Sequence, residues 1–197
     1  ASATRLATSC KPATARPVIL CAGSLHHDLI VEAPGLPRID QTLTGTAVRT
    51  AFGGKGGNQA AAAARAGAEV HMAGAVGSDD AAITLRAALD DAGVRRAGVQ
   101  THSGASGMSV AISLPDGSYG AVIVSGANLL FRPEAVIFPK ACTLLLLQSE
   151  LPEAANLDLA RRAHATGIRT ILNAAPARPV SAELLALTDL LVVNRGE

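Results

Sequence analysis

From residue 17 onwards, short apolar runs alternate along the chain with longer segments that carry helical patterns. Each apolar run is continuous, which is typical of a strand buried on both faces of a parallel sheet. Glycines close several of the helical segments. We therefore predict an α/β fold whose mainly parallel sheet is covered by helices on both faces. The predicted strands are 18–21, 69–74, 143–147, 169–172 and 190–193, and the predicted helices are the alanine run 61–64 up to Gly67, Asp79 to Gly93, Pro152 to Gly167, and a short one after Ser181.

Two segments do not fit this alternation of apolar runs and helical segments. Residues 29–49 include a period-two run of threonines and a valine at 42–48, and residues 108–124 alternate similarly around a Pro-Asp-Gly turn at 115–117. Period-two alternation indicates exposed antiparallel strands, and the turn indicates a hairpin. We predict that these segments, within about 29–49 and 101–127, form a small β-sheet that projects from the α/β body. It would serve as a flap over a binding site, as a dimer edge, or as both.

One segment, 51–60, combines four glycines with a lysine and two side-chain amides. Its sequence is Ala-Phe-Gly-Gly-Lys-Gly-Gly-Asn-Gln-Ala. Glycines allow close approach of a ligand to the backbone, and free N–H groups at a helix N-terminus favour anions and oxygen-rich ligands. The segment is not a Walker P-loop, because Gly56 rather than Ser or Thr follows Lys55, and it is not a dinucleotide fingerprint, because Gln59 replaces the last glycine. A purely structural turn would seldom need four glycines and would gain nothing from Lys55 and Asn58. We interpret the segment as a binding site.

Composition excludes several classes of function. The chain has 197 residues, of which 49% are hydrophobic, 17% charged and 2% aromatic, and its formal net charge is +1. The near-neutral charge provides no basic surface for nucleic acid or an anionic membrane, and the few aromatic residues provide no platform on which bases could stack. No apolar run reaches the roughly 18 to 20 residues that span a bilayer. Cys10, Cys21 and Cys142 are odd in number and widely spaced, so we expect reduced thiols in a cytoplasmic protein.

Residues 1–16 differ from the rest in composition. They are rich in alanine, serine and threonine, and no acidic residue precedes Asp28. We predict a disordered leader followed by one α/β domain over 17–197; an organelle transit peptide is the alternative for the leader.

Polar residues follow the predicted strands at their carboxyl ends. In open α/β sheets, ligands bind beyond the carboxyl ends of the strands. Carboxylates and amides suit the hydroxyls of a polyol, which both donate and accept hydrogen bonds. His26, His27 and Asp28 are adjacent in sequence and would rarely aim at one ion, so no metal site is predicted from them. The residues expected to converge beside Lys55 and Asn58 are Asp28, Glu150, Asn173, Asn194 and Glu197.

Residues 53–60 resemble the first signature of the ribokinase-like (PfkB family) carbohydrate kinases, and the match is closest to the ribokinase branch of that family. This resemblance implies a three-layer α/β/α fold, mainly parallel, with a small β-sheet lid that often dimerises. It also implies ATP-dependent phosphorylation of a sugar hydroxymethyl group, with ribose as the first candidate. The resemblance continues, in order and at family-like spacing, through Gly23-Ser24, Asp28, 76–79, 125–128, 148–150, 173–177 and 194–197.

The resemblance also assigns roles to residues. Gly53-Gly54 would form the hinge of the lid, and Asn194 and Glu197 match an Asn-x-x-Glu motif linked to ATP phosphates and Mg²⁺. A small-molecule sugar and ATP would be the partners, in a homodimer formed through the lid. The residues expected to hold the sugar are His26, His27, Asp28, Gly54, Lys55, Gly56, Gly57, Asn58 and Glu150.

The chain also departs from the family pattern. His26 stands where the family usually has asparagine, and residues 37–42 lack the usual Pro-x-x-Gly-Glu-Thr sequence. The family's Gly-Ala-Gly-Asp run, with its anion hole and catalytic aspartate, is absent, as are the adenine pocket and the monovalent cation (K⁺) site. We therefore expect the C-terminal part of the fold to be missing, no catalytic residue in the chain, and no kinase activity from the 197-residue chain alone. A catalytically inactive sugar-binding or regulatory protein and a nucleoside kinase of the same superfamily are alternatives; a dinucleotide oxidoreductase is a distant one.

Overall fold

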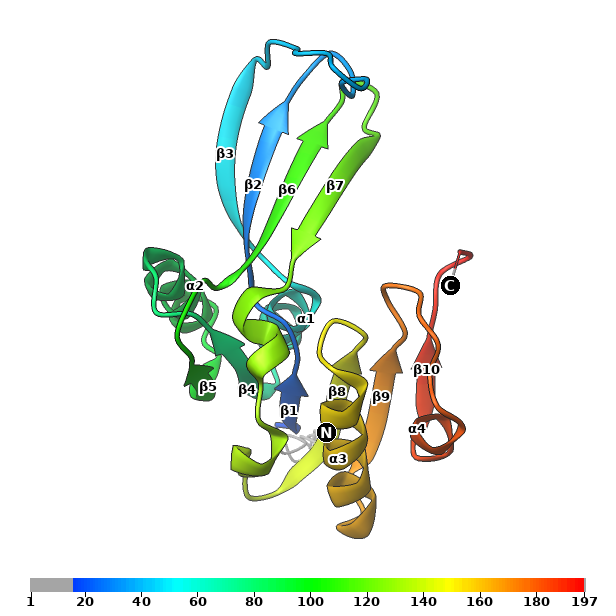
Figure 1. Ribbon diagram of the computed structural model, residues 1–197. Helices are drawn as coiled ribbons and strands as arrows, with labels where there is room; N and C mark the ends of the chain where they lie inside the picture. Colours follow the sequence, from blue (N-terminus) through cyan, green and yellow to red (C-terminus); the bar gives the residue numbers. More distant parts are fainter. Residues whose placement is uncertain (1–15, 197) are drawn as a thin grey trace, which may run out of the picture.

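The computed structural model describes residues 16–196, which form two sheets (Figure 1). Sheet A has six strands in the order β10-β9-β8-β1-β4-β5, and all of its neighbouring strands are parallel. This confirms the predicted parallel sheet. Its strands are β1 (Val18–Ala22), β4 (Glu69–Val76), β5 (Arg95–Thr101), β8 (Cys142–Gln148), β9 (Arg169–Asn173) and β10 (Leu190–Val192).

Strand β5 was not predicted. It lies at one edge of sheet A and pairs only with β4 in the described part of the chain. Its sequence, Arg-Arg-Ala-Gly-Val-Gln-Thr, buries only Val99. An edge strand with one buried residue carries no continuous apolar run, and so the hydrophobic pattern did not reveal it.

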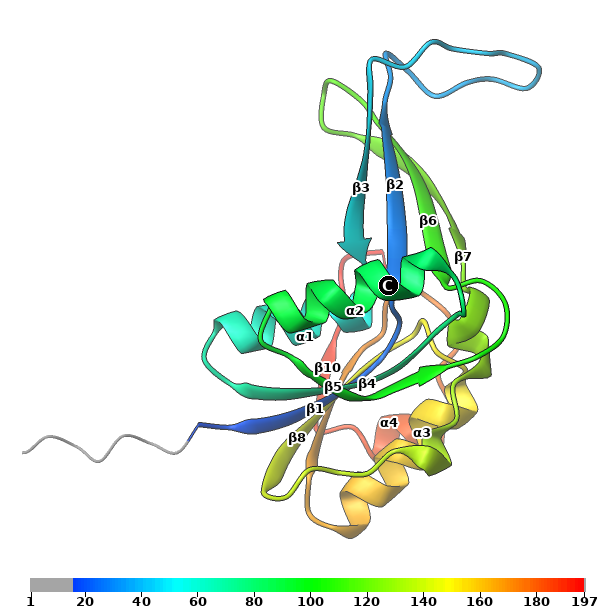
Figure 2. The same cartoon turned by 90° about the vertical axis from the view of Figure 1, so that its left-hand side faces the viewer.

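Helices cover both faces of sheet A, which gives the three predicted layers (Figure 2). The helices α1 (Lys55–Arg65) and α2 (Asp80–Asp91) lie on one face, and α3 (Glu153–Ala165) and α4 (Ala182–Ala186) lie on the other. Successive side chains of β1 point to opposite faces. Ile19 and Cys21 therefore belong to the apolar core under α1 and α2, whereas Leu20 and Ala22 belong to the core under α3 and α4. None of the described helices has the length and hydrophobicity to cross a bilayer.

The ends of the helices follow from local chemistry, as predicted. The Asp79 side chain accepts a hydrogen bond from Ala82 N at 3.1 Å, and the Ser181 hydroxyl accepts one from Leu184 N at 3.3 Å, so each caps its helix. Gly67, Gly93 and Gly167 follow their helices at φ values of 97°, 72° and 73°. Pro152 takes the N-cap position of α3 and so lies just before the first turn.

Cys21 and Cys142 are free, as the sequence predicted. Cys21 is fully buried, and burial raises the pKa of its thiol to about 12. Cys142 is only partly buried, and burial raises the pKa of its thiol as well. Both side chains are therefore protonated and unreactive near neutral pH.

Sheet B projects from the carboxyl edge of sheet A (Figure 1). Its order is β3-β2-β6-β7; β2 pairs antiparallel with β3 and parallel with β6, and β6 pairs antiparallel with β7. Two 3₁₀ helices then connect β7 to β8. The elements are β2 (His26–Glu32), β3 (Ala47–Gly53), β6 (Gly107–Ser113), β7 (Tyr119–Val124), η1 (Gly126–Leu130) and η2 (Pro133–Ala135).

The strands of sheet B differ from the prediction in one place, which is the start of β3. The predicted hairpin is present, and Gly117 has a φ of 85° in its turn. However, the threonines at 42–46 lie in the loop between β2 and β3, so the period-two run was wrong as evidence for a strand. Pairing decides the limits instead: Glu32 is opposite Ala47 and His26 is opposite Gly53, so the second strand ends inside the glycine segment.

Two polar side chains, one of them fully buried, fasten sheet B to the body. The Asn128 amide accepts a hydrogen bond from Leu25 N at 3.0 Å and donates to the carbonyls of Leu25 and Ser125. The Asp79 carboxylate accepts hydrogen bonds from Ser106 N at 2.8 Å and Ser106 Oγ at 2.6 Å. Burial raises the pKa of Asp79, but the hydrogen bonds from Ser106 outweigh it and hold that pKa below its ordinary value. These contacts fix the base of sheet B over the carboxyl edge of sheet A.

Candidate functional site

A pocket of about 290 Å³ lies where sheet B meets the carboxyl edge of sheet A. Strand β2 contributes every second residue to it, because alternate side chains of a strand share one face. Its floor is polar and comes from the start of β2, the start of α1 and the segment after β8. Its wall is mostly apolar and lies farther along the same face of sheet B, on β2, β6 and β7, because β2 pairs with β6 and β6 with β7. The floor carries His26, Asp28, Gly54, Lys55, Asn58 and Glu150, and the wall carries Ile30, Ser109, Ala111, Tyr119, Ala121 and Ile123.

The pocket therefore unites most of the residues expected to hold a ligand. Asp28 reaches it from within β2 and not from a loop after β1. His27 neighbours two lining residues but does not line the pocket, because its side chain leaves the other face of the strand. Asn173 and Asn194 do not line it either. Glu197 lies outside the described residues.

The N-terminus of α1 is not an open anion site, which corrects the expectation drawn from free N–H groups. Lys55 N donates to Glu150 Oε2 at 2.8 Å, and Gly56 N donates to Ser24 Oγ at 3.4 Å. Gly57 N donates to the Ser24 carbonyl at 2.9 Å. The carboxylate of Glu150 thus occupies the position that a bound anion would take at this helix end.

The four glycines of the segment have separate steric reasons. A Cβ on Gly53 would lie 2.1 Å from Asp28 Oδ2, and one on Gly57 would lie 2.5 Å from Phe52 Cζ. A Cβ on Gly56 would lie 2.6 Å from Gly23 Cα, where two backbones cross. Gly54 has a φ of 85°, which favours glycine.

Close packing thus explains more of this segment than the sequence suggested. Among its four glycines only Gly54 lines the pocket. Gly56 and Gly57 are buried in the first turn of α1, beneath the pocket floor, and their N–H groups bond to Ser24. A direct sugar contact by these two glycines stays a prediction.

Two polar atoms of the floor lack a protein partner. Asp28 Oδ1 and His26 Nε2 are buried and form no hydrogen bond with any described residue. Burial raises the pKa of Asp28, and the neighbouring Ser109 hydroxyl and His26 oppose this rise. Burial lowers the pKa of His26 more than the carboxylates of Glu150 and Asp28 raise it, so the imidazole is neutral near pH 7. Buried polar atoms are nearly always hydrogen-bonded in native proteins, so these two atoms suit a polar ligand.

Residues 17–197 match the family described as pfkB family carbohydrate kinase. The chain belongs to this family. It is 34% identical to the ribokinase of Bacillus subtilis (strain 168) over 183 residues, which cover 91% of this chain and 62% of that protein. It is also 34% identical to the ribokinase of Haemophilus influenzae over 189 residues, which cover 92% of this chain and 61% of that protein. The chain thus spans about three-fifths of the length of these relatives.

A solved structure of Arabidopsis thaliana ribokinase complexed with ribose and ATP has the same fold. The match has a TM-score of 0.79 at 29% identity and covers 93% of this chain and 61% of that one. The predicted ribokinase-like α/β fold, with its parallel sheet and a second small sheet, is therefore confirmed.

Two polar residues that the fold brings to the site had no role assigned to them from the sequence. Ser24 is fully buried at the end of β1, and its hydroxyl donates a hydrogen bond to Glu150 Oε2. Ser109 lies directly beside Asp28 because β2 and β6 pair in parallel. One feature of the sequence could have pointed to Ser24: it follows Gly23 just after a predicted strand. Nothing in the sequence pointed to Ser109, because the parallel pairing of β2 with β6 joins segments that are far apart along the chain.

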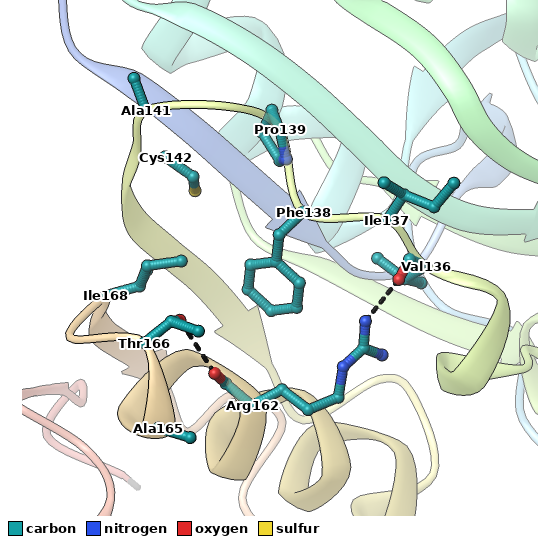
Figure 3. Close-up of a pocket in the computed structure, with 10 residues that line it drawn as sticks. All are labelled: Val136, Ile137, Phe138, Pro139, Ala141, Cys142, Arg162, Ala165, Thr166 and Ile168. Carbon is teal, nitrogen blue, oxygen red and sulfur yellow. Dashed lines mark hydrogen bonds between the residues drawn. The ribbon is translucent and has the colours of Figure 1, made fainter.

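A larger pocket of about 630 Å³ lies elsewhere, at the amino end of β8 (Figure 3). Its lining is mostly apolar, and its one cation, Arg162, is already engaged. The guanidinium donates to the carbonyls of Pro133 and Val136 and lies 5.1 Å from the centre of the Phe138 ring. This pocket therefore offers no free polar chemistry. Nowhere in residues 16–196 do three or more His, Cys, Asp or Glu side chains gather closely enough to hold a metal ion.

Proposed function

We propose that this chain forms the sugar-binding part of an ATP-dependent kinase that phosphorylates a sugar hydroxymethyl group, with ribose as the first candidate. One observation carries the proposal: two carboxylates, Asp28 and Glu150, share a small pocket with Lys55 and Asn58 beside an apolar wall. Sugar hydroxyls both donate and accept, so acidic acceptors and cationic or amide donors in one pocket suit them. The apolar side chains of the wall suit the C–H faces of a sugar ring.

Positioning is the main contribution that we assign to the chain. Phosphoryl transfer depends largely on orientation and on stabilisation of charge. Asp28 and Glu150 would accept hydrogen bonds from ring hydroxyls, and Lys55 and Asn58 would donate to sugar oxygens. Sheet B, as a lid hinged at Gly53-Gly54, would exclude the water that competes for the phosphoryl group.

For the nucleotide, we propose Asn194 and Glu197. Asn194 is exposed and follows β10, and its side chain accepts a hydrogen bond from Gly196 N at 2.7 Å. Amide and carboxylate oxygens suit Mg²⁺, which prefers oxygen ligands and keeps several waters. Bound Mg²⁺-ATP would supply the phosphoryl group and offset its charge. No described side chain is assigned as the catalytic base.

The function is tested with the 197-residue chain and with any longer protein that contains it. We expect D-ribose to bind the 197-residue chain in isothermal titration calorimetry, without ATP turnover in a coupled assay. A longer protein that also supplies a catalytic base is expected to phosphorylate the sugar. The same measurements are made with a panel of further ligands: 2-deoxyribose, fructose, ketodeoxygluconate and inosine. Turnover by the 197-residue chain would refute the expectation that it carries no catalytic base, and binding of inosine alone would favour a nucleoside kinase.

We also propose a homodimer formed through the face of sheet B that lies opposite the pocket. That face is apolar and exposed: Val122 is 69% exposed, Val124 60% and Val48 66%. Exposed apolar patches of this kind mark interaction sites. An identical sheet from a second copy would cover it.

The dimer is tested by sedimentation at a series of concentrations. Val122→Lys is expected to shift the protein to the monomer by placing a charge in the apolar face. Ile83→Lys is the matched control, because Ile83 is 71% exposed but lies on α2. A wild-type protein that stays monomeric throughout would rule out the dimer.

A further inference from the structure

The two carboxylate oxygens of Glu150 have different surroundings. Oε2 accepts hydrogen bonds from the Ser24 hydroxyl and from Lys55 N, the latter at 2.8 Å. Oε1 accepts no hydrogen bond from any described residue, although Glu150 lines the pocket and is only 7% exposed. One oxygen is therefore fixed by the protein, and the other is available to a ligand.

Ser24 is well placed to fix that oxygen. It is fully buried at the end of β1, and its sequence separation from Glu150 is 126 residues. Its hydroxyl accepts a hydrogen bond from Gly56 N at 3.4 Å, and its carbonyl accepts one from Gly57 N at 2.9 Å. Because a hydroxyl has one proton, accepting from Gly56 leaves that proton for Glu150. The first turn of α1 thus orients the Ser24 hydroxyl toward the carboxylate.

Steric constraints hold this arrangement in place. A Cβ on Gly56 would lie 2.6 Å from Ser24 N, so only glycine lets the helix approach Ser24 this closely. The helix end also favours a negative charge at Oε2. Without the serine hydroxyl, the carboxylate would keep only Lys55 N among the partners of Oε2 and could rotate about its terminal torsion, which has a broad energy well.

We propose that Ser24 is a positioning residue of the sugar pocket: it fixes Glu150 Oε2 at the N-terminus of α1, so that Oε1 faces a hydroxyl of the bound sugar. This inference rests on the proposed function, since it requires a hydroxylated ligand in the pocket. The ligand class it names is a polyol with a hydroxyl that donates to Oε1. Ser24 does not itself touch the sugar.

The test compares D-ribose affinity of the wild-type chain, Ser24→Ala, Glu150→Gln and the double variant by isothermal titration calorimetry. Ser24→Ala is expected to weaken binding about 10-fold, the lower end of what a hydrogen bond to a charged group contributes. In the Glu150→Gln background the same substitution is expected to change affinity by less than about 3-fold, because coupled residues are not additive. A residue with a general structural role would cause the same loss in both backgrounds.

Ser106→Ala is the matched control. Ser106 is also a buried serine that donates to a carboxylate at a helix N-terminus, that of Asp79, but it does not line the pocket. It is expected to lower the thermal midpoint about as much as Ser24→Ala, and any effect on ribose affinity is expected to be the same with and without Glu150→Gln, because Ser106 bonds Asp79 and not Glu150. If Ser24→Ala does not fold, Ser24→Cys keeps a similar volume and a weak donor for the same comparison.

The outcomes separate this inference from the proposed function. A wild-type chain that binds no sugar of the panel contradicts the function. Crystal structures of wild type and Ser24→Ala then decide the role of Ser24, because the Glu150 carboxylate is expected to leave the end of α1 in the variant only. An unmoved carboxylate, unchanged ribose affinity, or equal losses in both backgrounds would each overturn the inference.

Discussion

Replacing Asp28 by asparagine is expected to weaken ribose binding about 100-fold, which corresponds to about 2.7 kcal/mol. Asp28 is a partly buried residue of β2 whose carboxylate lies against Gly53, and its Oδ1 has no protein partner among the described residues. Hydrogen bonds to a charged group contribute about 1.5–3 kcal/mol each. Asparagine keeps the shape but loses the charge and one acceptor. Isothermal titration calorimetry with D-ribose measures the change.

The same substitution is expected to leave stability at neutral pH unchanged or slightly higher. Burial raises the pKa of Asp28 above its ordinary value. A carboxyl group whose pKa is higher in the folded than in the unfolded state costs stability at pH values above the folded pKa, and that cost disappears as the pH falls. Asparagine carries no such cost. Thermal midpoints at neutral pH test this, and a large drop in Asp28→Asn would contradict it.

The raised pKa also predicts a pH dependence of binding. In a series of measurements from neutral to acidic pH, ribose affinity of the wild type is expected to decrease as Asp28 becomes protonated, at a higher pH than for an ordinary aspartate. The remaining affinity of Asp28→Asn is expected to change less over that range. Asp116→Asn is the control, because Asp116 is an exposed carboxylate in the turn of sheet B, where it bonds Ser118. An Asp28→Asn chain that binds ribose as tightly as wild type would place the sugar elsewhere.

Gly56→Ala is expected to destabilise the chain by about 3 kcal/mol or more, as overpacking at a constrained site does. Helix propensity alone predicts the opposite sign, because alanine is favoured over glycine in a helix by about 1 kcal/mol. The new Cβ would lie 2.5 Å from Gly23 C and 2.6 Å from Ser24 N. These are backbone atoms, and they cannot rotate away as a side chain can.

Urea denaturation measures this difference, with Gly35→Ala as the control. A Cβ on Gly35 would meet no atom within 4 Å, so its replacement is expected to change the free energy of unfolding by less than about 0.5 kcal/mol. A more stable Gly56→Ala chain would mean that α1 and the end of β1 can separate at little cost.

The sequence alone determined the parallel α/β body and most helix ends, because these depend on local signals. Continuous apolar runs predicted five of the six strands of sheet A, and Asp79, Ser181 and the helix-ending glycines marked where helices start or stop. The convergence of Asp28, Lys55, Asn58 and Glu150 was predicted because parallel strands share one carboxyl edge. The edge strand β5 was not predicted, because only one of its side chains is buried and it therefore has no continuous apolar run.

Only the tertiary structure decided how the site is assembled. The parallel pairing of β2 with β6 brings Ser109 beside Asp28, and no periodicity within either segment encodes that register. The N–H groups of α1 looked free, yet Glu150, 95 residues after Lys55, accepts from the first of them. The glycines around Lys55 looked like a ligand loop, yet most of them make room for other parts of the chain. Contacts between distant segments fix these features, and a local sequence pattern carries no information about which distant segments meet.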